Sequence, residues 1–267
     1  MLCKIVKISR QAYYECQKHK QQWLLEEEML IGLVQEIRRR MPMIGCRKLH
    51  RMLKGDLEVM NIKLGRDAVF GILRRNGLLI KPKKRYVKTT NSFHHFKKYN
   101  NLIKDKVLRV SNEVFVSDIT YIRLRGGFCY LFLITDLYSR KIVGYDLNVS
   151  LGVEGALRAL KMALRGVENT ECLIHHSDRG IQYCCYEYTD LLKQRGIEIS
   201  MGEVGNPYDN AVAERVNGIL KVEFLLDSTF ESIGRAQQAV KEAINTYNTL
   251  RPHLSLDYLT PEAKYAA

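Results

Sequence analysis

The sequence lacks the features of a membrane-spanning or exported protein. Its longest apolar run, YLFLI at Tyr130–Ile134, is far shorter than the about 20 residues that cross a bilayer as a helix. The first residues, MLCKIVKISR, do not contain the uninterrupted apolar region that a signal peptide needs. We therefore expect a cytoplasmic protein.

The sequence also lacks paired cysteines. Its 7 cysteines include no C-x-x-C pair, and Cys184 and Cys185 are adjacent. Zinc sites commonly contain C-x-x-C pairs, and adjacent cysteines suit neither a zinc site nor an ordinary disulfide bond. We interpret the cysteines as small buried hydrophobic residues.

Acidic residues are scarce in the first part of the chain. Residues 1–100 contain 23 Lys and Arg against 8 Asp and Glu, a net charge of +15, whereas residues 101–267 have a net charge of −2. A basic segment attracts polyanions, of which nucleic acid is the most common in the cytosol. With 46% hydrophobic residues among 267, the chain can form one large domain and a small one.

The first 80 residues show short helical patterns. Apolar spacing predicts helices over Leu24–Arg40, Cys46–Leu53 and Arg66–Asn76, with Pro42 and Gly77 as stop signals. Short basic helices are typical of a helix-turn-helix unit, although a generic three-helix cluster with a charged face would give the same pattern. The candidate DNA contacts here are Arg47, Lys48, Arg66, Arg74 and Arg75.

A basic linker follows at residues 81–106. Five of the eight residues from Lys81 to Lys88 are Lys or Arg. Such a segment could follow a phosphate backbone, or it could simply connect two domains. The candidate DNA contacts in it are Lys83, Lys84 and Arg85.

From about Val107 the chain alternates between strands and helices. Three β-rich runs come first, EVFVSDITYIRL, GFCYLFLITD and RKIVGYDLNV. There follow a helix at Val153–Leu164, a strand CLIHHSD, a helix ending near Arg195, a strand IEISMG, a helix from near Asp209 and a last helix at Ile233–Leu250. This order predicts an α/β domain with a mixed sheet and helices on its faces.

Two aspartates lie in or at the ends of predicted strands. Asp118 interrupts the apolar run VFVSDITYI, and Asp178 ends the run LIHHSD. A carboxylate in a central strand is costly unless it is paired, hydrogen-bonded or bound to a metal. Neither local sequence supplies a cationic partner.

A third acid lies on the helix predicted near Asp209. There Glu214 belongs to a polar stripe with Asn210, Asn217 and Lys221. We expect Asp209 to cap the start of the helix, which leaves Glu214 as the chemical candidate. Carboxylates without His or Cys ligands favour Mg²⁺ or Mn²⁺, and two such ions can promote phosphodiester displacement. A protein of this size nevertheless contains several acids in strands and helices, so position alone leaves the metal site open.

Several short motifs of the sequence resemble those of a known family. Asp178 and Glu214 are separated by 35 residues. The words around the acids and in the basic region are SDITYI, LITDLYSRKIVGY, HSDRGIQY, GNPYDNAVAERVNGILKVE, YNTLRPHLSLDYLTP, ISRQAYY, IGCRKLHRML and GILRRNGL. Together they resemble the D-D-35-E transposases encoded by the second reading frame of a large bacterial insertion-sequence family, which are similar to retroviral integrases.

The resemblance implies a ribonuclease-H-like catalytic core with a five-stranded mixed sheet at residues 107–267, preceded by a helix-turn-helix region at residues 1–80. It implies that Asp118, Asp178 and Glu214 are catalytic and bind Mg²⁺ or Mn²⁺, with two ions, and that Lys221 lies near the DNA. It further implies DNA cleavage and strand transfer at terminal inverted repeats by a homo-oligomer. The chain would be fused to, or partnered with, an upstream-frame product, and as a bacterial DNA-binding protein it would associate with the nucleoid.

The sequence departs from the family wording in a few places. Phe115 stands where Trp is common, and ERVNGILK replaces the commoner ESFFGTLK. Retroviral integrases carry an N-terminal zinc module, but His50, His94 and His95 have no accompanying C-x-x-C, so we predict no structural zinc.

Two other function classes remain as alternatives to a transposase. One is a DNA-binding regulator or inactive remnant with a non-catalytic core, and the other is a nuclease of the ribonuclease-H type. The presence of all three acids argues against the first, and the basic N-terminal third argues against the second.

Other polar residues allow two interpretations each. His175 and His176 either tune the acid site or pack at a strand end; Arg251 and His253 either contact DNA or end a helix; Tyr121 and Tyr183 either line the substrate groove or are buried in the sheet.

Overall fold

The computed structural model describes residues 9–80, 95–203 and 210–267. The chain divides into two compact units, Met1–Lys81 and Pro82–Ala267, beside the boundary expected at residue 80. The predictions on Lys83, Lys84, Arg85 and Asp209 lie outside the described residues. The roles assigned to the two units and to the linker stay predictions.

The first unit contains α2 (Arg10–Arg40), α3 (Cys46–Val59) and α4 (Arg66–Arg75). Helix α2 begins at Arg10 instead of the predicted Leu24, and the Ser9 hydroxyl caps it by accepting the Ala12 N–H at 3.0 Å. The early part was not predicted because it has no apolar periodicity. The buried residues of α2, Leu30 and Val34, both lie in its later half.

Gly77 ends the third helix as predicted. Its φ of +67° lies in the left-handed region, and the next N–H, of Leu78, bonds to the Leu73 carbonyl at 2.7 Å. This arrangement satisfies carbonyls at the helix end that would otherwise lack partners.

The second unit is built on a six-stranded mixed sheet. Its strands are β1 (Val114–Leu124), β2 (Gly127–Asp136), β3 (Ile142–Asn148), β4 (Ile174–Ser177), β5 (Glu198–Met201) and β6 (Thr229–Phe230). The order is β3-β2-β1-β4-β5, with β1, β2 and β3 antiparallel and with β4 and β5 parallel to β1. The mixed sheet is confirmed. The prediction of five strands missed β6, which pairs with the end of β1 and is too short to show a period.

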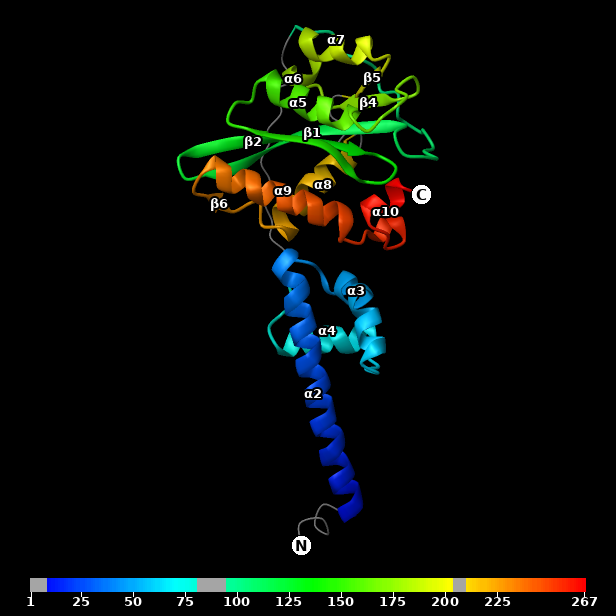
Figure 1. Ribbon diagram of the computed structural model, residues 1–267, viewed down its shortest axis with the longest axis vertical. Coiled ribbons are helices and arrows are strands. Elements are labelled where there is room, and N and C mark those ends of the chain that lie inside the picture. Colours follow the sequence, from blue (N-terminus) through cyan, green and yellow to red (C-terminus); the bar gives the residue numbers. More distant parts are fainter. Residues whose placement is uncertain (1–8, 81–94, 204–209) are drawn as a thin grey trace. The chain divides into compact units, whose positions relative to one another are not determined.

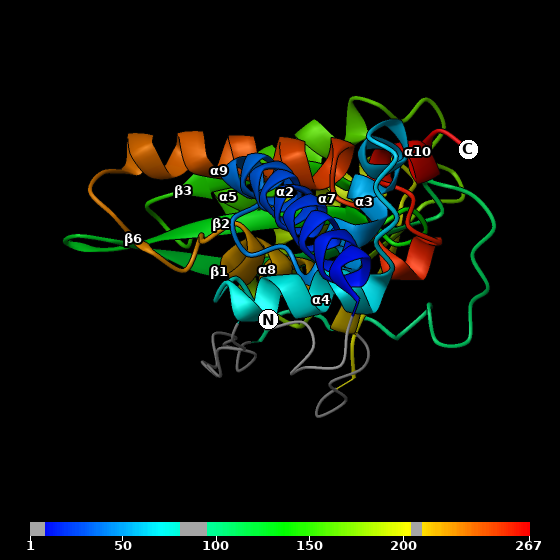
Figure 2. The same cartoon turned by 90° about the horizontal axis from the view of Figure 1, so that it is seen from below.

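Helices cover both faces of this sheet (Figure 1). On one face lie α5 (Val153–Leu164), α6 (Ile181–Cys184) and α7 (Tyr186–Gln194), and on the other lie α8 (Ala211–Glu223) and α9 (Ile233–Thr249). Figure 2 shows α8 and α9 on the same side of the strands. The helix predicted to end near Arg195 is two helices, because Cys185 adopts an extended conformation between them.

The faces of β1 divide the core in two. Phe115 packs with Phe132 and the residues of α5 and α7, whereas Val114 and Val116 pack with Ala213 of α8. Because side chains alternate along a strand, Asp118 lies on the α8 face.

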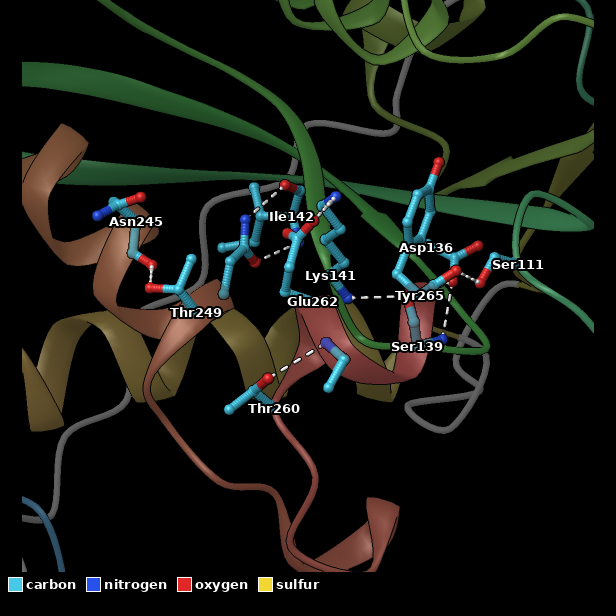
Figure 3. A network of polar contacts seen from close by, with 12 residues as sticks. Ser111, Asp136, Ser139, Lys141, Ile142, Asn245, Thr249, Thr260, Glu262 and Tyr265 are labelled. Atoms are coloured by element: carbon cyan, nitrogen blue, oxygen red, sulfur yellow. Dashed lines mark hydrogen bonds and ion pairs between the residues drawn. The ribbon is translucent and has the colours of Figure 1, made fainter. Parts of the chain in front are cut away.

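The last residues of the described chain form polar contacts with the turn between β2 and β3 (Figure 3). After the 3₁₀ turn η1 (Leu254–Leu256), helix α10 (Pro261–Tyr265) brings Glu262 to Lys141 at 2.8 Å. At the start of the turn, Asp136 accepts the Ser139 N–H at 2.7 Å and, from the segment before β1, the Asn112 N–H at 2.8 Å. These contacts make the turn and α10 one polar network.

The described cysteines only partly follow expectation. Cys46, Cys129, Cys184 and Cys185 are buried, but Cys16 and Cys172 are exposed, so the prediction was wrong for these two. Among the described residues, no helix has the length and apolar character needed to cross a membrane.

Candidate active site

The pairing of β1 with β4 brings the two aspartates to neighbouring positions. The strands are parallel, and their last paired residues are Ser117 and Ser177. Asp118 and Asp178 are the next residue in each strand's direction, so both lie at the same level of the sheet. Alternation places them on the same face.

A glycine turn holds Asp178. Its Oδ1 accepts the Gly180 N–H at 2.9 Å. A Cβ at position 180 would lie 2.9 Å from this same oxygen, so another residue there would force the carboxylate or the turn to move.

The polar stripe of α8 faces β1. The Asn210 amide nitrogen donates to the Ser117 carbonyl at 3.2 Å, and the Asn217 amide nitrogen donates to Asp118 Oδ2 at 2.6 Å. Glu214 lies between these two contacts in the sequence and is exposed. The helix starts at Ala211, with Asn210 at its N-cap position.

The neighbouring acids act on the charge of Asp118. The pKa of the Asp118 carboxyl is raised to about 7, chiefly by burial, then by the carboxylate of Asp178 and to a smaller extent by that of Glu214. The hydrogen bonds from Asn217 and from the Ile119 N–H lower it. The charges of the three predicted acids are thus coupled in this structure.

Lys221 completes the stripe two turns beyond Glu214. Its ammonium lies 4.2 Å from the centre of the Tyr121 ring, which is half-buried. Burial lowers the pKa of Lys221, the charges of Asp118 and Asp227 raise it, and that of Arg123 lowers it. Lys221 is therefore close enough to Asp118, and to Arg123 near the end of β1, for both charges to affect it.

The acid cluster fits a divalent cation in its chemistry. Its donors are carboxylate oxygens, which Mg²⁺ and Mn²⁺ prefer, and a cation would relieve the like-charge crowding around Asp118. Among the described residues, however, no three His, Cys, Asp or Glu side chains lie close enough together to form a finished metal site.

The two histidines before Asp178 are buried at the end of β4. His175 Nε2 lies 2.7 Å from the Ser117 hydroxyl and 2.8 Å from the Tyr188 hydroxyl, and His176 Nδ1 lies 2.8 Å from the Ser200 hydroxyl. Burial lowers the pKa of His175 to about 3. The structure therefore favours packing at the strand end.

Three other residues for which the sequence allowed two interpretations are also buried. Arg251 is 2% exposed and grips Glu223 of α8 through two hydrogen bonds, of 2.8 and 2.9 Å. His253 packs edge-on against Tyr247, and Tyr183 belongs to the core on the α5 face. These side chains stabilise the fold and are not exposed to bind phosphates.

The predicted DNA contacts of the first unit differ in exposure. Arg47, Arg66, Arg74 and Arg75 are exposed, and Lys48 is half-buried. Arg75 is engaged within the unit, because its guanidinium bonds to Glu27 at 3.0 Å and lies 4.7 Å from the Trp23 ring centre. A role for these residues in DNA binding stays a prediction.

Sequence reasoning missed the partners of the acids. It identified the polar stripe on α8, but not the bond from Asn217 to Asp118 or the pair formed by Glu223 and Arg251. The spacing of three residues from Glu214 to Asn217 was a signal of a shared face. The strand that this face meets could not be read from the helix.

Known proteins resemble this chain over most of its length. Models described as "Integrase core domain" match residues 109–207 and 195–261. The chain is 34% identical to the "Insertion element IS600 uncharacterized 31 kDa protein" of Shigella sonnei, covering 98% of this chain and 96% of that protein. It is 29% identical to "Transposase InsF for insertion sequence IS3A" of Escherichia coli K12, covering 98% and 91%.

A solved structure shares the fold. The chain is similar to a chain of the simian T-cell lymphotropic virus intasome in complex with PP2A regulatory subunit B56 gamma, with a TM-score of 0.51 and 17% identity. The similarity covers 84% of this chain and 75% of that one. It confirms the expected integrase-type α/β fold.

Proposed function

This chain belongs to the integrase-core family of bacterial insertion-sequence transposases, and on that premise we propose that it cleaves DNA at the terminal inverted repeats of its element and joins the freed strand to target DNA. The family supports an enzyme of the polynucleotidyl transferase type. The observation that carries the finer proposal is the register of β1 and β4, which brings Asp118 and Asp178 together on the face that α8 covers.

We propose that Asp118, Asp178 and Glu214 hold Mg²⁺ or Mn²⁺, as two ions. When bound, such ions activate the attacking oxygen and stabilise the leaving oxygen of a phosphodiester. The chain's own groups prepare this site: the Asn217 amide and the Ile119 N–H orient the Asp118 carboxylate, and the Gly180 N–H orients Asp178.

In the proposed reaction, a water oxygen bonds to phosphorus at the end of the element and the 3′-oxygen of the element strand leaves. This freed 3′-hydroxyl then bonds to a phosphorus of target DNA and displaces another 3′-oxygen. Lys221 contributes a positive charge beside the acids, where a phosphate would approach.

The proposed partners are double-stranded DNA and further copies of the chain. The excess of basic residues in residues 1–100 supports binding of the terminal repeats by this part. An upstream-frame product is a further proposed partner. It would act either fused to this chain or as a separate protein bound to it.

The proposed chemistry is tested by Glu214→Gln in a strand-transfer assay with Mg²⁺ and a duplex that carries the element's end. Joining should fall by at least about 1,000-fold, because the variant loses one carboxylate charge at the transition state, while the duplex is still bound. The matched control is Glu242→Gln, on the exposed side of α9, which should join like the wild type. Joining by Glu214→Gln at the wild-type rate would contradict the assignment of Glu214 as a metal-binding acid. A wild type that binds but never cleaves would favour the regulator.

A further inference from the structure

Helix α8 is docked on β1 by two amides. Asn210 and Asn217 are seven residues apart, about two helical turns, and their contacts reach consecutive positions of β1, the Ser117 carbonyl and the Asp118 carboxylate. Glu214 lies between them. The two amides therefore fix the helix that carries the third acid against the strand that carries the first.

Neither amide has its ordinary helical role. Asparagine is a favoured N-cap because its side chain can accept a helix N–H, yet Asn210 forms no such cap bond and donates to β1 instead. Asn217 is 6% exposed in the middle of α8, where asparagine has a poor helix propensity. Its presence there calls for a reason other than helix stability.

Packing alone does not explain Asn217. Among the described residues, its Oδ1 is buried and has no hydrogen-bond partner, and a buried unsatisfied acceptor lowers stability. A leucine of similar volume would avoid that loss. The gain lies in the other half of the amide, whose nitrogen donates to Asp118 Oδ2 at 2.6 Å.

This bond fixes the orientation of Asp118. Oδ1 accepts the Ile119 N–H at 2.9 Å and Oδ2 accepts the Asn217 amide, so both oxygens are restrained. A carboxylate oxygen has more than one acceptor position, and each oxygen therefore retains a lone pair for a cation. Without Asn217, the Ile119 N–H would be the one hydrogen bond left to this carboxylate among the described residues, and the carboxylate could rotate about Cβ–Cγ.

We infer that Asn217 is a positioning residue that sets the orientation of Asp118 and its separation from Glu214, and so tunes the affinity of the acid cluster for a divalent cation. This inference rests on the proposed function, in which the three acids hold the ion. Outer groups that orient metal ligands typically change metal affinity by about 10- to 100-fold when removed.

The test is a Mn²⁺ titration of the full chain, with free Mn²⁺ measured by electron paramagnetic resonance, for the wild type and Asn217→Leu. Asn217→Leu should raise the apparent dissociation constant by about 10- to 100-fold. Thermal unfolding without Mn²⁺ measures any loss of stability separately. If Asn217→Leu does not fold, Asn217→Ser replaces it, because its hydroxyl ends one bond closer to the backbone and should give the same direction of change.

Asn248→Leu is the matched control. Asn248 is another buried asparagine, and its amide exchanges two hydrogen bonds of 3.0 Å with the backbone of Ile142, away from the acids. This variant should lower the unfolding temperature without changing the Mn²⁺ affinity. Equal changes of affinity in both variants, or none in the Asn217 variant, would overturn the inference.

Glu214→Gln separates the inference from its premise. If the wild type binds Mn²⁺ and Glu214→Gln weakens that binding, the acid cluster holds the ion and the Asn217 result decides the inference alone. If Glu214→Gln binds as well as the wild type, the proposed site fails, and the positioning role fails with it.

Discussion

Asp118 and Asp136 are aspartates of adjoining strands whose surroundings are opposite. Burial raises the pKa of both carboxyls. Around Asp136, every further influence favours the charged form: the Ser139 hydroxyl and N–H, the Asn112 N–H and the charge of Arg140. Around Asp118, two hydrogen bonds favour the charge, but Asp178 and Glu214 oppose it.

This difference is the one expected between an acid that stabilises the fold and an acid that takes part in the proposed chemistry. Asp136 accepts hydrogen bonds from Ser139 of its own turn (Figure 3) and from the Asn112 N–H before β1, and no carboxylate of the described residues opposes its charge. Asp118 is left among like charges, which a cation from outside would relieve. In the sequence both look alike, as an aspartate within or at the end of an apolar strand.

The first way to break the comparison is Asp118→Asn. Joining of an element-end duplex should fall by at least about 1,000-fold, because the acid cluster loses a carboxylate charge. The free energy of unfolding, measured with urea in EDTA, should stay the same or rise by about 1 kcal/mol, since a like charge beside Asp178 has been removed. A large loss of stability would show that Asp118 is a structural acid like Asp136.

Asp136→Asn should have the reverse effect. The amide would turn an NH₂ group toward a donor, either of Ser139 or of Asn112, and the free energy of unfolding should fall by about 3 kcal/mol. Joining per folded molecule should not change. Urea unfolding and the joining assay check both statements, and a selective loss of joining at unchanged stability would contradict the structural assignment.

A smaller effect on stability is expected from His175 on β4, the strand that pairs with β1 beside Asp118. The pKa of His175 is lowered to about 3 in the folded protein. Below about pH 6.5 the unfolded chain therefore binds a proton at His175, whereas the folded protein does not. Stability should therefore fall as the pH drops below about 6.5. Between pH 7.5 and 5.0 the wild type should lose about 2 kcal/mol more than His175→Gln.

Urea unfolding at the two pH values measures this difference. His19→Gln is the control, because His19 is exposed on α2 and its removal should leave the pH dependence unchanged. An identical pH dependence in the wild type and His175→Gln would mean that the buried site does accept the proton.

The sequence predicted the elements with strong periods and missed those defined by tertiary contacts. Strand β2 and helix α5 have the predicted bounds, because alternation and apolar spacing are strong there. Strand β6 is defined by its pairing with the last residues of β1. The break at Cys185 follows from an extended backbone conformation in an otherwise helical sequence.

The candidate site shows the same limit. The three acids could be named from their sequence context, but their arrangement depends on the register of β1 and β4 and on the side of α8 that meets β1. Arg251 was left open as a phosphate contact for the same reason. Its partner Glu223 is 28 residues away, and no local pattern links them.

The docking of α8 also has an evolutionary consequence. Each residue added to an α-helix turns everything after it by about 100°, so an insertion between Asn210 and Asn217 would separate Glu214 from one of its two anchors on β1. The 35 residues between Asp178 and Glu214 therefore form two parts, which tolerate insertions and deletions to different degrees. Changes of length before Asn210 need only let α8 reach β1 again, whereas changes within the helix alter its phase. Natural variation in the spacing of these acids should accordingly accumulate before residue 210.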